Sequence, residues 1–229
     1  MFTLSSVVPW GRSFDEYRRM FALTDADLAT RILGCGDGPA SFNADLTRRG
    51  GRIVSCDPLY QFDAAQIHLR IDETSAEVLA QARQNAHEFV WDDAIPDVDA
   101  LQRVRMSAMT AFLDDYEQGR REGRYVVAGL PSLPFADGAF ELVLCSHFLF
   151  LYSQQRDAAF HVESMRELCR VAREVRVFPL LALGGQPSPH VGAVSADLVA
   201  RGFTVAIERV PYEFQRGGNE MMRVRTMRA

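Results

Sequence analysis

The chain has 229 residues, of which 48% are hydrophobic and 24% charged, and this composition fits one large globular domain. The formal charge of −5 argues against nucleic acid as a partner, because phosphate binding needs a basic surface. All 25 basic residues are arginines, which excludes any site built on a lysine, such as a Schiff base or a Walker-type phosphate site.

Location and redox chemistry follow from two further features of the sequence. No apolar run reaches the roughly 18 residues of a membrane span, and residues 1–6 lack the pattern of a signal peptide. We therefore expect a soluble cytoplasmic protein without a membrane partner. The cysteines form no C-x-x-C pair, so core packing is favoured over a metal site, and no metal is expected. They are Cys35, Cys56, Cys145 and Cys169.

Residues 1–29 predict a helical cap that precedes the main fold. Ser13 and Glu16 have the spacing of a capping box, in which each side chain accepts from the backbone of the other end of the first turn. The helix is expected to run to about Leu23. Its apolar stripe consists of Phe14, Tyr17, Met20 and Phe21.

Strand and helix patterns then alternate. Residues 31–33 predict a first strand, 41–49 a helix that ends at two glycines, and 52–56 a second strand. Such a strand–helix–strand unit is the basis of a parallel sheet. Residues 61–124 are too long for a simple crossover and predict a helical insertion beside the active face. Its helices are expected to start near Thr74 and Asp97, separated by Pro96.

The alternation resumes after the insertion, within the same single domain of residues 1–229. The expected elements are strands at 125–128 and 140–145, a helix at 154–173, a strand at 175–181, a helix at 191–201, and final strands at 203–213 and 220–226 around a hairpin loop at 215–219.

A glycine-rich turn, residues 34–40, joins the first strand to the first helix of this alternation. Glycines let the backbone approach a ligand closely, and a helix N-terminus offers free N–H groups, so the turn suits a nucleotide-like cofactor. The dinucleotide pattern G-x-G-x-x-G is not met. Its last glycine falls on Pro39 when counted from Gly34, and on Ser41 when counted from Gly36.

This turn resembles the first motif of class I S-adenosylmethionine-dependent methyltransferases, [D/E]-x-G-x-G-x-G. Gly36 and Gly38 match, Ala40 takes the last glycine position, and Gly34 stands where the family has an acid that helps to orient the methionine part of the cofactor. The resemblance implies that Gly34, Cys35, Gly36 and Gly38 contact the cofactor.

An acid at the end of the second strand is the next feature of the resemblance. Asp57 stands at the family's spacing, which implies that its carboxylate accepts the ribose hydroxyls, with Pro58 beside it. The alternative is that Asp57 and Pro58 only make a turn.

The segment from Gly129 to His147 resembles the family's third and fourth strands. The similar pieces are Leu133-Pro134-Phe135, Asp137-Gly138 and Phe140-Glu141-Leu142-Val143. Gly129 replaces the acid that commonly meets the adenine amine, which leaves the backbone of Leu130 for that role, and Ser146 ends the fourth strand.

The resemblance covers roughly residues 30–60 and 124–226 and implies an α/β fold. This fold is a Rossmann-like, seven-stranded, mostly parallel sheet with one antiparallel strand and helices on both faces, here with the helical insertion added.

Five aromatic, basic or imidazole side chains complete the candidate site. Arg12 and Tyr17 are candidates for closing the cofactor site, because a guanidinium pairs well with a methionine carboxylate; otherwise they are a surface arginine and a core tyrosine. His147 is a possible general base or a structural histidine. Trp10, His147 and Tyr152 are candidates for the acceptor pocket.

The resulting hypothesis is a methyltransferase that transfers a methyl group from S-adenosylmethionine to a small-molecule acceptor by direct displacement and releases S-adenosylhomocysteine. A second hypothesis, motivated by Gly34 and Gly129 in place of two acids, is a protein that binds this cofactor without catalysis. A nicotinamide-dependent oxidoreductase is a third, which the incomplete dinucleotide pattern disfavours.

Overall fold

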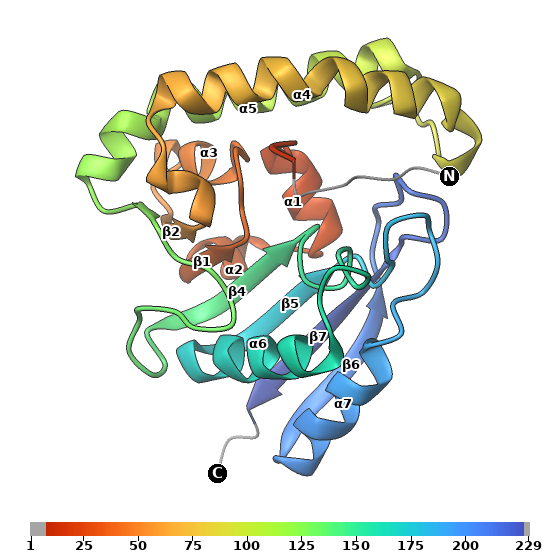
Figure 1. The fold of residues 1–229 in the computed structure, drawn as a ribbon. Coiled ribbons are helices and arrows are strands. Elements are labelled where there is room, and N and C mark those ends of the chain that lie inside the picture. Colours follow the sequence, from red (N-terminus) through yellow and green to blue (C-terminus); the bar gives the residue numbers. More distant parts are fainter. Residues whose placement is uncertain (1–7, 227–229) are drawn as a thin grey trace.

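The computed structural model describes residues 8–226, which form a twisted central sheet with helices packed on both faces (Figure 1). Residues 1–7 of the predicted cap and residues 227–229 lie outside the described part. The sheet has seven strands in the order β3-β2-β1-β4-β5-β7-β6. They are β1 (Arg31–Cys35), β2 (Arg52–Cys56), β3 (Tyr125–Val126), β4 (Phe140–Ser146), β5 (Ala172–Phe178), β6 (Phe203–Arg209) and β7 (Glu220–Thr226).

Strand directions confirm the predicted fold class. β1 pairs in parallel with β2 and with β4. The pairs β2–β3 and β4–β5 are also parallel, whereas β7 is antiparallel to both β5 and β6. Cys35 is level with Cys56 on one side and with Cys145 on the other. The carboxyl ends of β1, β2 and β4 therefore meet at one edge of the sheet, where ligands bind in open α/β folds.

Two apolar layers hold the helices to the sheet. Successive residues of a strand contribute alternately to one layer and to the other. Leu33 and Val143 face α6 (Ala158–Val171) and α7 (Val191–Ala200). Their chain neighbours Ile32 and Leu144 face the other layer, which contains α1 (Phe14–Met20) and α3 (Phe42–Arg48). This period of two is what a strand buried on both faces requires.

The predicted insertion is a pair of long helices, α4 (Ala64–Gln84) and α5 (Val98–Arg121), which lie side by side across the end of the molecule that holds α1 and α3 (Figure 1). The expected start of the first helix near Thr74 is wrong by ten residues. Asp63 caps the helix through a capping box with Gln66, a local signal that overrides the weaker apolar periodicity of the first turns. Short 3-10 turns, η1 (Pro58–Gln61) and η2 (Ala86–Glu88), flank α4.

Other element boundaries also differ from the predictions. The helix expected at 154–173 starts at Ala158, because Asp157 caps it, and it ends at Val171. β5 follows without a loop and ends at Phe178, before Pro179, which cannot donate to a sheet ladder. β3 has only two residues instead of the predicted 125–128, and β6 ends at Arg209 instead of at residue 213.

One short helix was not predicted. α2 (Asp25–Leu28) is a single turn held by a capping box between Thr24 and Asp27, which is too short for an apolar periodicity. Asp27 also accepts from Arg176 of β5, at 2.9 Å, so the turn is fastened to the sheet.

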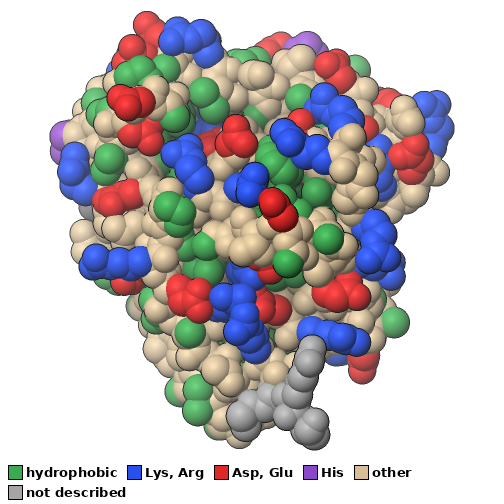
Figure 2. All heavy atoms as spheres, turned by 180° about the vertical axis from the view of Figure 1, so that it is seen from behind, with side chains coloured by type: hydrophobic (Ala, Val, Ile, Leu, Met, Phe, Trp, Pro, Cys, Tyr) green, Lys and Arg blue, Asp and Glu red, His purple; other side chains and the backbone are tan. Residues whose placement is uncertain are grey.

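The cysteines and the surface charges add little to the description of the candidate site. All four cysteines are buried and unpaired, and the described residues hold no group of three or more His, Cys, Asp or Glu side chains placed to bind a metal. Within residues 8–226, each helix is too short or too polar to cross a bilayer. On the face seen in Figure 2, basic and acidic side chains are interspersed.

Candidate functional site

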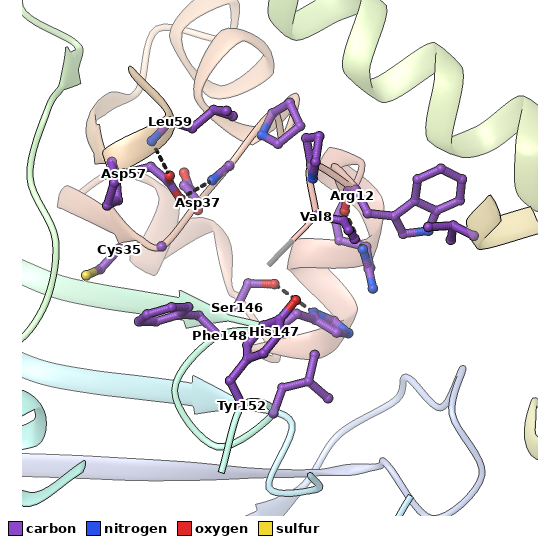
Figure 3. A pocket seen from close by; sticks show the side chains of 18 of the residues that line it. Val8, Arg12, Cys35, Asp37, Asp57, Leu59, Ser146, His147, Phe148 and Tyr152 are labelled. Atoms are coloured by element: carbon purple, nitrogen blue, oxygen red, sulfur yellow. Dashed lines mark hydrogen bonds between the residues drawn. The ribbon is translucent and has the colours of Figure 1, made fainter. Parts of the chain in front are cut away.

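A cavity of about 740 Å³ lies at the carboxyl edge of the sheet, within the size range of small-molecule sites. Its wall comes from the cap segment, the glycine turn, the ends of β2, β4 and β5, the insertion helix α4 and the β6–β7 connection. The strand order reverses between β1 and β4, so the cavity sits at the topological switch point of the sheet. Figure 3 shows part of this wall.

Two glycines give the turn between β1 and α3 its shape. Gly36 has φ +66° and Gly38 has φ +52°, values that residues with a side chain rarely adopt. A Cβ at Gly36 would lie 3.0 Å from the ring of Phe148, so the turn also packs closely against the segment after β4. Both glycines line the cavity, and with no side chain they let a ligand approach the turn closely.

Gly34 has a different role from its neighbours, because the carboxylate of Asp37 lies directly above it. A Cβ at Gly34 would stand 2.1 Å from Asp37 Oδ2, so no residue with a side chain fits without displacing that carboxylate. Gly34 is not on the cavity wall, whereas Asp37 is. An acid therefore does occupy this part of the site, and it comes from position 37 rather than from position 34.

Asp37 is held by two hydroxyl donors from different elements. The Tyr17 hydroxyl of α1 donates to Oδ1 (2.5 Å), and the Ser55 hydroxyl of β2 donates to Oδ2 (2.6 Å). Burial raises the pKa of Asp37 to about 6, although both hydrogen bonds favour its charged form. The described residues place no cation within ion-pair distance of Asp37, so its charge is available to a cationic ligand group.

Asp57 follows β2 and caps η1. Its Oδ1 accepts from the backbone N–H of Leu59 (2.7 Å), and its Oδ2 accepts from that of Gly38 (2.9 Å). Burial raises the pKa of this carboxyl as well. Each carboxylate oxygen has a second lone pair, so Asp57 can also accept two ligand hydroxyls.

The segment after β3 approaches the turn after β2 closely. A Cβ at Gly129 would lie 3.0 Å from the ring of Pro58, which explains why a residue without a side chain stands where the family has an acid. Pro58, Gly129 and Leu130 all line the cavity beside Asp57. The backbone here forms a slot next to the expected ribose position.

The cap segment closes the cavity from the side of α1. The backbone N–H of Ser41 donates to the carbonyl of Arg12 (3.1 Å), and a Cβ at Gly11 would stand 2.1 Å from the carbonyl oxygen of Pro39. These contacts place Trp10 and Arg12 on the cavity wall. In Figure 3 the guanidinium of Arg12 lies on the His147 side of the cavity, away from Asp57.

His147 follows β4 in an unusual backbone conformation. Its φ of 51° is in the left-handed region, which marks local strain in a residue with a side chain, and its N–H donates to the carbonyl of Phe178 (2.7 Å). Nδ1 lies 2.9 Å from the Ser146 hydroxyl. Burial, with the charges of Arg12 and Arg105, lowers the pKa of His147 well below its usual range, so the imidazole is neutral at pH 7.

The structure places thirteen of the fourteen sequence-predicted site residues along this cavity, and the exception is Gly34. The thirteen are Trp10, Arg12, Tyr17, Cys35, Gly36, Gly38, Asp57, Pro58, Gly129, Leu130, Ser146, His147 and Tyr152. Sequence reasoning missed Asp37 and Phe148. The acid between two motif glycines was a visible signal for Asp37, whereas Phe148 carried none.

Comparisons with known proteins were made for sequence and for backbone. No family model matches the sequence. It is 31% identical over 226 residues to a protein of Methanocaldococcus jannaschii named "Uncharacterized protein MJ0045", with 97% of each chain covered.

Similar solved structures include magnesium protoporphyrin IX methyltransferase from Synechocystis PCC 6803 with bound SAM (12% identity, 93% of this chain and 91% of that one, TM-score 0.45). A second is 1,6-didemethyltoxoflavin-N1-methyltransferase from Burkholderia thailandensis (13% identity, 93% and 79%, TM-score 0.49). A third is a SAM-dependent methyltransferase from Aquifex aeolicus (13% identity, 92% and 87%, TM-score 0.42). Likenesses this distant do not identify a function.

Proposed function

The chain belongs to the family of the Methanocaldococcus jannaschii protein MJ0045, and we propose that it is an S-adenosylmethionine-dependent methyltransferase that acts on a small molecule. The observation that carries this proposal is the pair of carboxylates, Asp37 and Asp57, that line the cavity at the glycine turn. Asp57 is suited to the ribose hydroxyls, and Asp37 is suited to the ammonium group of the methionine part.

The residues around the turn fit this cofactor as a set. A buried carboxylate without a cationic partner is costly, and the ligand's ammonium group would supply that partner to Asp37. Pro58, Gly129 and Leu130 line the cavity beside Asp57, where a purine ring can pack against them. The cofactor, when bound, supplies an activated methyl group, and the protein's task is then to align an acceptor with it.

The part of the cavity beyond the glycine turn supports catalytic turnover rather than cofactor binding alone. The wall continues past the turn to His147 and Tyr152 and then to α4, which leaves room for a second molecule beside the cofactor. His147 is neutral and its Nε2 has no hydrogen-bond partner among the described residues, so it is suited to orient an acceptor through a hydrogen bond.

Ligand-induced stabilisation tests the cofactor directly. Saturating S-adenosylhomocysteine is expected to raise Tm by several degrees, because a ligand that binds the native state stabilises it by mass action, whereas NAD is expected to leave Tm unchanged. A shift with NAD alone would support the oxidoreductase instead. Bound cofactor without S-adenosylhomocysteine formation from S-adenosylmethionine on any acceptor of a broad metabolite panel would support the non-catalytic alternative.

Cofactor affinity is expected to depend on pH through Asp37. Its pKa is about 6 in the free protein, and pairing with an ammonium group stabilises the ionised form, so the affinity for S-adenosylhomocysteine is constant above about pH 7 and falls as the pH drops below 6. Calorimetric titrations between pH 5 and 8 measure this. In Asp37→Asn the pH dependence is expected to disappear, and its persistence would assign the titration to another group.

A further inference from the structure

The part of the cavity beyond the glycine turn has a mostly apolar, aromatic wall. Phe178, Tyr212 and Phe214 contribute rings from the end of β5 and from the β6–β7 connection, and Tyr152 of the segment after β4 also lines the cavity. At the mouth, Phe62 and Leu69 are 42% and 60% exposed, although they border the cavity. Such a surface suits an apolar acceptor with at least one ring.

Beside this part of the cavity, which we call the chamber, positively charged side chains outnumber negatively charged ones. Arg105 of α5 is fully buried, and its Nη1 donates to Glu16 Oε2 (2.5 Å). Glu16 also accepts from the Tyr212 hydroxyl (2.8 Å) and from the Ser13 backbone (2.9 Å), so its carboxylate is fully engaged. Arg12 shares this neighbourhood, and therefore two guanidinium groups face one carboxylate.

Arg12 is the one of these two cations that lines the cavity. Its Nη1 donates to the carbonyl of Trp10 (2.5 Å), its Nε is buried without a partner, and no described carboxylate lies within ion-pair distance of it. Burial and the charge of Arg105 lower the pKa of Arg12, and the charge of Glu16 acts in the opposite direction. Arg105 likewise keeps Nε and Nη2 without partners.

The acids of the cavity wall do not offset these cations at the acceptor end. Asp37 and Asp57 lie at the glycine turn, where the proposed cofactor would occupy both carboxylates. Glu73 of α4 is 53% exposed and pairs with Arg70 at 3.3 Å, so water screens its charge. A cationic acceptor would find no buried carboxylate among the described residues of the chamber, whereas an anionic one would find Arg12.

We propose that the methyl acceptor is an apolar, ring-containing molecule with an anionic group, such as a carboxylate, and that Arg12 binds this group. The inference rests on the proposed function, because it concerns the second ligand of the same cavity. It assigns Arg12 to the acceptor rather than to the methionine carboxylate. Pairing a desolvated guanidinium with an anion removes the cost of leaving that charge uncompensated.

A matched pair of probes with the same ring and opposite charge tests the proposal. We would titrate 2-naphthoate and 2-naphthylmethylammonium into the complex with S-adenosylhomocysteine and measure both dissociation constants by calorimetry. Naphthoate is expected to bind at least about tenfold more tightly, the size of one charge-assisted contact. In Arg12→Met the preference is expected to vanish. Arg156→Met, at an exposed arginine of the same cavity, is the control and keeps it.

The outcomes separate this inference from the proposed function. Equal or tighter binding of the ammonium probe, or failure of both probes to bind, would overturn the anionic acceptor while cofactor binding stands. If Arg12→Met weakens S-adenosylhomocysteine and leaves the probe preference intact, Arg12 holds the methionine carboxylate and the inference is wrong. A protein that does not bind S-adenosylhomocysteine in the thermal assay would instead refute the proposed function.

Discussion

Replacement of Asp57 by alanine is expected to weaken S-adenosylhomocysteine binding by about 100-fold or more. The change removes the proposed acceptor of both ribose hydroxyls, and hydrogen bonds to a charged group each contribute about 1.5–3 kcal/mol. It also frees the backbone N–H groups of Gly38 and Leu59, which hold the glycine turn against η1. Isothermal titration calorimetry at pH 7.5 measures the loss.

Two further variants make this result specific. Asp57→Asn keeps one carbonyl oxygen, so an intermediate loss is expected. Asp45→Ala removes an acid of α3 that pairs with Arg48 at the surface, and cofactor affinity should not change. Unaltered binding by a folded Asp57→Ala protein would show that Asp57 only makes the turn and would remove the ribose contact from the proposal.

Moving the acid between positions 34 and 37 is expected to have the second large effect, on both stability and cofactor affinity. Gly34→Asp alone should lower stability by about 1–3 kcal/mol or more, because its Cβ would overlap the Asp37 carboxylate. Asp37→Gly alone should weaken S-adenosylhomocysteine at least about tenfold through loss of the partner for the ammonium group. The double variant Gly34→Asp/Asp37→Gly places the acid where the methyltransferase motif has it, and we expect it to recover both stability and affinity.

A truncated ligand locates the effect of Asp37 on the amino-acid part of the cofactor. 5′-Methylthioadenosine lacks the ammonium and carboxylate groups, so Asp37→Gly should leave its affinity unchanged. Equal weakening of both ligands would mean that Asp37 acts through the shape of the turn. Lack of recovery in the double variant, if that protein folds, would refute the functional equivalence of the two positions.

Long elements with a clear apolar period were predictable, and short or capped ones were less so. β1, β2 and β4 begin where expected because their residues alternate between two buried layers. The start of α4 was missed although Ile67 and Ile71 continue its buried face with a spacing of four, and the capping box at Asp63 marks the start. β5 was shifted because the chain passes from α6 into the strand without a turn residue.

The candidate site was predictable to the extent that it is built from one contiguous segment. Gly36, Gly38 and Asp57 flank a single strand–turn–helix unit, and their spacing follows from its geometry. Asp37 and its partners Tyr17 and Ser55 belong to three separate elements. Their convergence depends on how α1 packs on the sheet, which no local pattern encodes.

By itself the sequence determined the α/β alternation, the glycine turn and the acid after the second strand, because backbone periods and conformational limits act over a few residues. The absence of lysine likewise excluded sites built on a lysine, such as a Schiff base. Only the tertiary structure decided that Asp37 fills the space above Gly34, and that Arg12 lies near Glu16, whose carboxylate pairs with Arg105. Both arrangements arise from burial and charge between distant segments, whose energies depend on the packed surroundings and not on neighbours along the chain.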